Sequence, residues 1–284
     1  MTEPPIDVTH HDEHAVILRQ SKSVHYEAPF LHLLFGAERA LLLDTGATAD
    51  PALFPLRATV DGLIDAWLAA HPRTGYGLVV AHTHGHGDHV AADAQFSDRP
   101  DTVVVGRELE AVTEFFGFGE DWPEGAVTFD LGGRELTVLG SLGHHRASIT
   151  IFDPRTGFLL TGDTVLPGRL YVEDTEAYVA TIERLVGFAA REPVTSVRGC
   201  HVEMSRRPGR DYPLGAVSQP DERPLPMAPE RLVAVRDAMV GIGARRDVFR
   251  YDDFIVYNRP PTWDMLRLVA RARVHKAMRT FGAH

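Results

Sequence analysis

The stretch His84-Gly85-His86-Gly87-Asp88-His89 places three imidazoles and one carboxylate within six residues, directly after the apolar run 78–81. Imidazole binds zinc, copper, iron and nickel, and carboxylate is a hard oxygen ligand, so the mixture predicts a first-row metal ion and zinc first. Residues two apart in a helix point about 200° away from each other, so the first two histidines could not hold one ion from a regular helix. Glycine tolerates positive φ, and the two glycines are expected to let the backbone fold around the ion. We predict a strand that ends in a metal-binding loop, followed by a helix from Val90.

Two alternative interpretations of this stretch are weaker. A solvated histidine-rich loop usually lacks both the regular glycines and the acid. A structural zinc site is usually closed by thiolates, and the chain contains the single cysteine Cys200. Such a cage therefore cannot form, and we interpret Cys200, which precedes His201, as a small buried thiol rather than a ligand.

Further candidate ligands follow strand-like apolar runs elsewhere in the chain. In open α/β sheets, ligands gather outside the carboxyl ends of the strands, so one shared site is the simplest interpretation. The candidates at or near the ends of these runs are Asp44, His144, His145, Asp163 and His201.

The ordered series Asp44, His84-x-His86-x-Asp88-His89, His144, Asp163 and His201 resembles the five motifs of the metallo-β-lactamase-fold hydrolases, from about residue 12 to about residue 205. The resemblance implies two divalent metal ions, most simply Zn²⁺, with iron as the alternative. The first would be held by His84, His86 and His144. The second would be held by Asp88, His89 and His201, with Asp163 bridging the two.

The resemblance also implies that Asp44 orients a ligand rather than binding metal. Residues 142–148 lack the proline and the second glycine that usually surround the third motif of this family. His145 therefore stays the alternative to His144 as the ligand from this loop.

A pair of such ions predicts hydrolytic chemistry. Zinc lowers the pKa of bound water from 15.7 to about 7, and two ions about 3.5 to 4 Å apart can share the resulting hydroxide. We expect metal-bound hydroxide to attack an ester, thioester or lactone carbonyl of a small metabolite, with one metal polarising the carbonyl and the other stabilising the leaving group. Asp88 is expected to orient the hydroxide and to accept its proton.

Three other functions remain as alternatives. They are a phosphodiesterase, an iron-dependent redox enzyme with the same ligands, and a metal-dependent binding protein without catalysis. The chain has 29 basic and 39 acidic residues, a net charge of −10, and no obvious basic patch. Nucleic acid is therefore disfavoured as a partner, because phosphate-binding proteins usually carry such a patch. A small molecule is the expected substrate.

Substrate contacts are less explicit in the sequence. Arg169 and Tyr171 follow Asp163 closely and are the candidate substrate-binding residues. An aromatic segment could form a lid over an apolar group, but ordinary packing explains it equally well. Its aromatic residues are Phe115, Phe116, Phe118 and Trp122.

Apolar runs of strand length alternate with helical patterns throughout the first 205 residues. This alternation fits the four-layer αββα sandwich that the resemblance implies. We predict a catalytic core over residues 1–205. Residues 206–284 are expected to form a C-terminal extension packed on the core, made of a proline-rich loop, a helix, a hairpin turning at Asp252-Asp253, and a basic amphipathic helix over 262–279.

Composition indicates an ordinary cytoplasmic enzyme. At 284 residues with 44% hydrophobic content, the chain can bury a substantial core. No apolar stretch approaches a membrane span, and the first residues lack a secretory signal. A lone cysteine agrees with a reducing compartment. The last helix is expected to pack on its own domain, with a homodimer contact or a membrane-surface helix as the alternatives.

Overall fold

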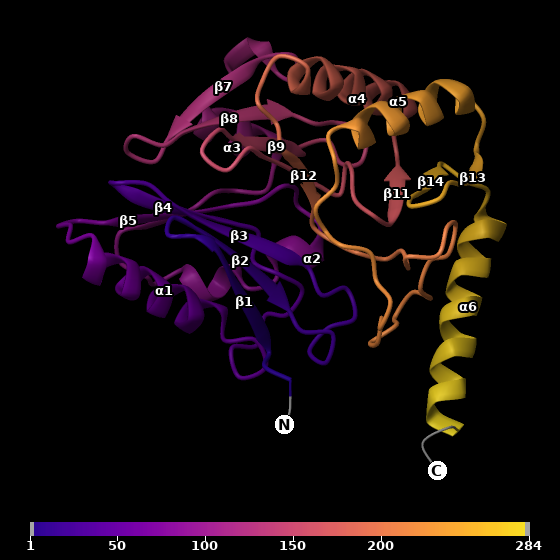
Figure 1. Ribbon diagram of the computed structural model, residues 1–284, viewed down its shortest axis with the longest axis horizontal. Coiled ribbons are helices and arrows are strands. Elements are labelled where there is room, and N and C mark those ends of the chain that lie inside the picture. The colour runs from indigo at the N-terminus through magenta and orange to yellow at the C-terminus, as the bar shows by residue number, and fades with distance from the viewer. Residues whose placement is uncertain (1–2, 282–284) are drawn as a thin grey trace.

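The first sheet is built from the N-terminal part of the chain. In the computed structural model, which describes residues 3–281 and the side chains of 3–274, six strands follow the order β1-β2-β3-β4-β5-β6 (Figure 1). The pairs from β1 to β4 are antiparallel, and β4, β5 and β6 are parallel. The strands are β1 (Ile6–Asp12), β2 (Ala15–Gln20), β3 (Phe30–Phe35), β4 (Arg39–Leu43), β5 (Gly77–Ala81) and β6 (Thr102–Val104).

The second sheet has five strands in the order β12-β10-β9-β8-β7. Four of its strands form antiparallel pairs, and β12 lies parallel to β10. The strands are β7 (Ala126–Asp130), β8 (Glu135–Gly140), β9 (Ile149–Asp153), β10 (Phe158–Gly162) and β12 (Ser196–Gly199). Since β5, β10 and β12 are followed by candidate ligands, their carboxyl ends decide where the site lies.

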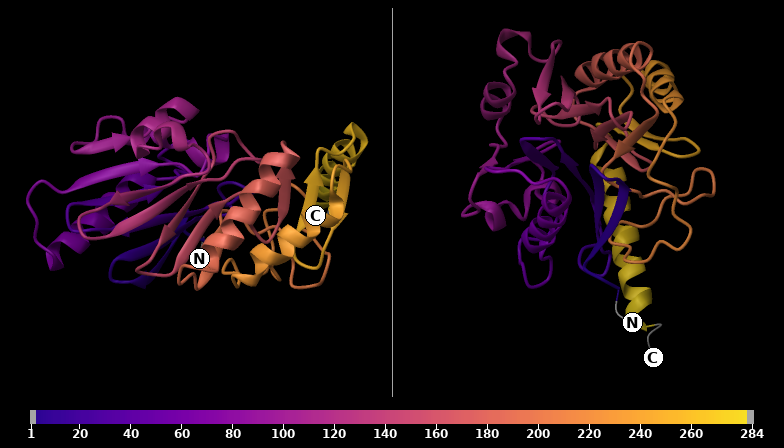
Figure 2. Two further views of the ribbon diagram at one scale, coloured as in Figure 1. Left: turned by 90° about the horizontal axis from the view of Figure 1, so that it is seen from above. Right: turned by 60° about the vertical axis from the view of Figure 1, so that its left-hand side comes forward.

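Three hydrophobic layers join the two sheets and the helices. Helix α1 (Leu56–Ala70) covers the outer face of the first sheet, and α4 (Thr175–Ala189) with α5 (Glu230–Ile242) covers the outer face of the second (Figures 1 and 2). Between the sheets, side chains from β4 and β5 pack against those from β8, β9 and β10. The four-layer prediction is confirmed.

The central strands of the first sheet show why their sequences are apolar without interruption. Along β4, Leu42 faces the α1 layer and Leu41 faces the second sheet. Successive side chains of a strand point to opposite faces, so a strand buried on both faces needs apolar residues at every position. The prediction of strands from these runs is confirmed.

Arg134 connects the two sheets through the interior. Its Nε and Nη2 donate to the two carboxylate oxygens of Asp153 on β9, at 3.1 and 2.6 Å. Its Nη1 donates to the carbonyls of His14 and Phe35 in the first sheet, at 2.5 and 3.0 Å. Burial opposes ionisation of Asp153, but the bonds from Arg134 hold its pKa below the usual value. This ion pair is buried and fully bonded.

Arg134→Met is expected to lower the free energy of unfolding by about 3–5 kcal/mol, because Asp153 would keep a buried, unpaired charge. Urea unfolding measures the loss. Arg146→Met is the matched control, since Arg146 pairs with Glu108 at the surface and such pairs contribute about 0–1 kcal/mol. A loss below about 1 kcal/mol in Arg134→Met would show that the pair does not hold the sheets together.

Helices and strands of the C-terminal part of the chain pack against, or pair with, elements from before residue 205. Helix α5 packs beside α4, and the hairpin of β13 (Asp247–Arg250) and β14 (Ile255–Asn258) turns at Asp252-Asp253 as predicted. Strand β14 pairs in parallel with β11 (Arg169–Val172), which completes a third sheet. The domain boundary after residue 205 stays a prediction, and in the structure one sheet and one hydrophobic cluster contain residues from both sides of it.

The last helix, α6 (Thr262–Phe281), runs along one edge of the molecule (Figure 1). Leu268 packs against Ile255 and Tyr257, whereas Trp263 and Leu266 are exposed. A dimer contact through this helix stays a prediction. Within residues 3–281, no helix combines the length and the low polarity that a membrane crossing requires.

Candidate metal centre

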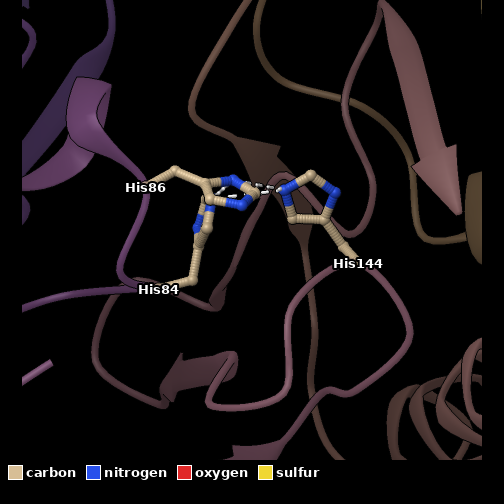
Figure 3. A group of neighbouring side chains, drawn as sticks. All are labelled: His84, His86 and His144. Carbon is tan, nitrogen blue, oxygen red and sulfur yellow. Dashed lines mark hydrogen bonds between the residues drawn. The ribbon is translucent and has the colours of Figure 1, made fainter. Parts of the chain in front are cut away.

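Three histidines form the first donor cluster. The Nε2 of His84 lies 2.9 Å from the Nδ1 of His86 and 3.2 Å from the Nε2 of His144, and the last two atoms are 3.1 Å apart (Figure 3). Three nitrogens that face one point match tetrahedral zinc, whose Zn–N bonds of about 2.0–2.1 Å separate the ligand atoms by about 3.3–3.4 Å. The resemblance assigned these three residues to one metal ion, and the structure brings their ring nitrogens together.

Four side chains form the second donor cluster, beside the first. The Nε2 of His201 lies 3.2 Å from Oδ2 of Asp88 and 3.4 Å from Nε2 of His89. Asp163 contributes both of its oxygens, with Oδ1 3.6 Å from His201 and Oδ2 3.6 Å from His89. Each of the four side chains offers one ligand atom that lies within 4.8 Å of those of the other three, so together they could hold one ion.

Asp163 lies between the two clusters. Its Oδ2 is also 3.9 Å from Nε2 of His144 in the first cluster. Its Oδ1 is buried and accepts no hydrogen bond from any residue that the structure describes. A buried carboxylate oxygen without a donor is costly unless a cation compensates it. The donor set therefore fits two metal ions with Asp163 between them.

The electrostatics of the second cluster favour positive charge at its centre. Burial lowers the pKa of His201, but Asp163 and Asp88 outweigh it and raise that pKa to about 9. Burial also opposes ionisation of Asp163, yet His201 and His89 hold its pKa well below the usual value. In the first cluster, burial and the neighbouring His89 hold the pKa of His84 well below its usual value, so this imidazole is neutral. The carboxylates are thus in the form that binds metal, and a cation held among them would take the place of the proton on His201.

Oxygen atoms behind the imidazoles fix their orientation. The Nδ1–H of His144 donates to the Tyr171 carbonyl at 2.9 Å, and that of His201 donates to the Glu27 carbonyl at 3.1 Å. The Nδ1–H of His89 donates to Oδ2 of Asp44 at 3.0 Å. In each ring the bond leaves the Nε2 lone pair free for an ion, which is how metal-binding histidines are usually held.

Asp44 also accepts bonds from its other neighbours. The backbone N–H of Thr83 donates to its Oδ1 at 2.7 Å and the Cys200 thiol donates to its Oδ2 at 3.1 Å. Asp44 is buried with φ of +68°, a strained conformation for a residue that is not glycine. The structure thus places Asp44 behind His89, outside the second donor cluster. Cys200 is buried, as predicted.

The local fold at the histidine motif differs from the prediction. Neither Gly85 nor Gly87 has a positive φ. His86 has extended backbone angles, φ −70° and ψ 153°, and residues two apart in an extended chain point to the same side, so two such histidines can meet without a left-handed residue. The helix α2 (Gly87–Val90) begins three residues earlier than expected, and a 3₁₀ turn follows at Asp93–Phe96.

The structure separates His144 from His145. The His145 Nδ1 accepts from the backbone N–H of Ala147 at 3.2 Å, and its ring stands outside the first cluster. The ring centroid of His145 lies 5.1 Å from that of His86. His144, rather than its neighbour, faces the other two ligands.

Gly143 is the glycine on which this loop depends. It has φ of +114°, and a Cβ there would lie 2.4 Å from the Cα and Cβ of Tyr178 on α4. Its carbonyl accepts from the backbone N–H groups of Glu173 and Asp174 at 2.8 and 3.0 Å. An added methyl group would collide with the backbone of α4 at the buried Tyr178, so the loop would have to move and carry His144 with it.

Gly143→Ala is expected to weaken metal binding about 10- to 100-fold, the usual effect of disturbing the support of a ligand, and to lower the melting temperature. Titration against a chromophoric chelator measures the affinity. Gly133→Ala is the control, because Gly133 also has a positive φ, of +72°, but faces open space. Equal effects in both variants would mean that backbone strain alone, and not the collision at Tyr178, is responsible.

A cavity of about 250 Å³ opens beside the second cluster. Asp88, Asp163 and His201 line it, together with the predicted substrate contacts Arg169 and Tyr171. The guanidinium of Arg169 is already bound by Glu203 at 2.5 Å, by Asp211 at 2.7 Å and by the Tyr212 carbonyl. Substrate binding by Arg169 and Tyr171 stays a prediction, and any contact from Arg169 would have to coexist with these bonds.

Other cavity residues were not found from the sequence. Lys22, Tyr26 and Glu27 come from the connection between β2 and β3 and line the same cavity. Isolated polar residues in a loop carry no signal of their own. Of the two interpretations of the aromatic segment, ordinary packing holds, because Phe116 and Phe118 are buried between the sheets and none of its four aromatic residues lines this cavity.

Residues 31–199 match the family model of the metallo-beta-lactamase superfamily. The chain is 28% identical over 128 residues to a hydroxyacylglutathione hydrolase of Rhizobium meliloti, covering 42% of this chain and 47% of that protein. It is also 28% identical over 207 residues to the acyl-coenzyme A thioesterase MBLAC2 of Gallus gallus, covering 61% of this chain and 72% of that protein.

Solved structures give the same fold. A metallo-beta-lactamase from Erythrobacter litoralis superposes with a TM-score of 0.52 at 17% identity, over 85% of this chain and 99% of that one. The chain spans about half the length of the hydroxyacylglutathione hydrolases that it matches. The structural likeness supports the fold alone.

Proposed function

The chain belongs to the metallo-β-lactamase superfamily, and on that basis we propose that it is a dinuclear metal hydrolase that cleaves an ester, thioester or lactone bond of a small metabolite. One observation carries the proposal. Two donor clusters lie beside each other with Asp163 between them, and Asp88, Asp163 and His201 of the second cluster line a cavity of about 250 Å³. The hydrolases of thioesters among the similar proteins make a thioester the first substrate class to test.

We propose zinc as the resident ion, bound by the seven side chains of the two clusters. When bound, a pair of such ions would make water acidic at neutral pH and polarise a carbonyl oxygen. The chain's own residues would move the proton and hold the ligands in place. Asp88, which lines the cavity, would orient the attacking water and accept its proton. Asp44 and the backbone carbonyls of Glu27 and Tyr171 hold the imidazole rings in place.

A carbonyl substrate is proposed ahead of a phosphodiester because the similar proteins named above include hydrolases of thioesters. We also propose a cytoplasmic location, with which the buried single cysteine is consistent.

The test combines metal analysis with a substrate panel. Protein prepared without added metal is analysed by mass spectrometry for zinc and iron and then assayed on matched thioester, ester, lactone and phosphodiester substrates. We expect two zinc ions per chain, turnover of a carbonyl substrate, loss of activity on chelation and recovery on adding zinc. Two bound ions with phosphodiester cleavage alone, or iron with redox turnover, would contradict the proposal.

A further inference from the structure

The cavity beside the metal centre contains a lysine whose charge is not used by the fold. Lys22 is half-buried and is one of two lysines in a chain with 29 basic residues. Its Nζ donates to the Tyr26 carbonyl at 3.2 Å. Among the residues that the structure describes, no carboxylate lies within ion-pair distance of it. Other donor positions of the ammonium are left for a ligand.

The carboxylates around Lys22 already have donors of their own. Glu222 receives both Nη groups of Arg19, at 2.5 and 2.8 Å. Glu203 receives the Arg169 side chain at 2.5 Å and the Arg169 backbone N–H at 2.7 Å. Glu27 receives the Tyr26 hydroxyl at 2.8 Å. Each carboxylate near Lys22 therefore has a hydrogen-bond donor other than Lys22. Arg169, the other cation that lines the cavity outside the metal centre, is already bound by Glu203 and Asp211.

Lys22 also lies between two cavities. It lines the 250 Å³ cavity that contains Asp88, Asp163 and His201, and it lines a second cavity of about 330 Å³ beside it, next to Arg19 and Ser21. Gln219 is shared in the same way. Ligand cavities usually measure about 300–1,000 Å³, so a substrate can extend from the metal centre past Lys22 into the second cavity.

We propose that Lys22 binds an anionic group of the substrate, a carboxylate a few bonds from the scissile carbonyl, and so determines specificity for acidic esters or thioesters. This inference rests on the proposed function. A lysine ammonium is a point charge with three donors and accepts a carboxylate from several directions. Burial and the nearby Arg19 lower the pKa of Lys22 to about 8, so it is still mainly charged at pH 7.

The test uses the metal-loaded enzyme and pairs of thioesters that differ in one charge. One pair has the charge on the acyl side, S-ethyl monothiosuccinate against its terminal amide. The other has it on the thiol side, S-acetyl-3-mercaptopropionate against its amide. We expect Lys22→Met to raise KM for the preferred acid about 10- to 100-fold, the value of a hydrogen bond to a charged group, and to change kcat/KM for the amides less than about twofold. The pair whose KM values respond to Lys22→Met shows whether the anionic group lies on the acyl side or on the thiol side of the scissile bond.

Two further variants keep the result interpretable. Lys22→Arg retains the charge and is expected to retain a preference for the acid. Arg206→Met removes an exposed cation outside both cavities and is expected to leave both KM values unchanged. Equal KM changes for acid and amide in Lys22→Met, or no preference for an acid in the unaltered enzyme, would overturn the inference while leaving the hydrolase proposal intact.

A binding readout separates the two proposals if no thioester is cleaved. Lys22 is labelled with acetic anhydride at pH 8, and the peptide that contains it is quantified by mass spectrometry. We expect succinate to slow the labelling of Lys22 and succinamide not to slow it. Equal rates with both would overturn the role of Lys22, whatever the activity of the enzyme.

Discussion

Asp163→Asn is expected to lower turnover on the order of 10³-fold and to reduce the metal content below two ions per chain. Asp163 belongs to the second cluster and its Oδ2 also lies 3.9 Å from His144 of the first, while its Oδ1 accepts no hydrogen bond from any residue that the structure describes. An amide has nearly the same shape but no charge, so it would bind cations less well. Losing a metal removes several kcal/mol of transition-state stabilisation, which corresponds to this loss of rate.

Metal content by mass spectrometry and thioester turnover are measured on the same preparation of Asp163→Asn. The control is Asp98→Asn, because Asp98 is an exposed carboxylate that pairs with Arg57 and belongs neither to the donor clusters nor to the cavity lining. The control is expected to keep two ions and full turnover. Two ions and normal turnover in Asp163→Asn would show that Asp163 does not bridge the metals.

Asp88→Asn is expected to lower kcat about 10²- to 10⁴-fold, the usual contribution of a general acid or base, while most of the metal stays bound. The first cluster does not involve Asp88, and the second would still have His89, His201 and Asp163. An amide oxygen could still coordinate an ion, but the amide cannot take a proton from water. The loss should therefore appear in kcat rather than in metal content.

The kcat of Asp88→Asn is followed at saturating zinc, so that reduced affinity does not enter the result. His145→Asn is the comparison, since His145 stands beside the first cluster without facing it, and it should keep most of kcat. Full turnover by Asp88→Asn would remove Asp88 from the chemistry and leave it as a metal ligand at most.

Much of the candidate site could be predicted from the sequence because its chemistry is concentrated in short motifs. Six residues supply four of the seven expected ligands, and the others follow apolar strands whose ends meet at one edge. The choice of His144 depended on family resemblance, and its position next to His84 and His86 comes from a glycine loop. Where several residue types in a fixed order are required together, a sequence is informative.

The walls of the cavity and two strands were less accessible to prediction. Strand β1 has one buried residue, Ile6, and its other positions are exposed, so it has no apolar pattern. Strand β11 pairs with β14, about 85 residues later in the chain, and this pairing cannot be read from four residues. Lys22 lies in a short connection, and it borders the cavity because residues distant in sequence, such as His201 and Gln219, form the rest of its lining. Such features depend on which segments meet, and single-residue preferences carry little of that information.

Strand β11 gives the C-terminal part of the chain an influence over the metal centre. The Tyr171 carbonyl of this strand orients His144, while the strand itself is held by β14 and, through Arg169 and Asp211, by Arg271 of α6. Substitutions in the β13–β14 hairpin or in α6 can therefore shift β11 and change the orientation of His144. Evolution could adjust affinity for the ion by mutating a region that contributes no donor atom, and laboratory selection could use the same route.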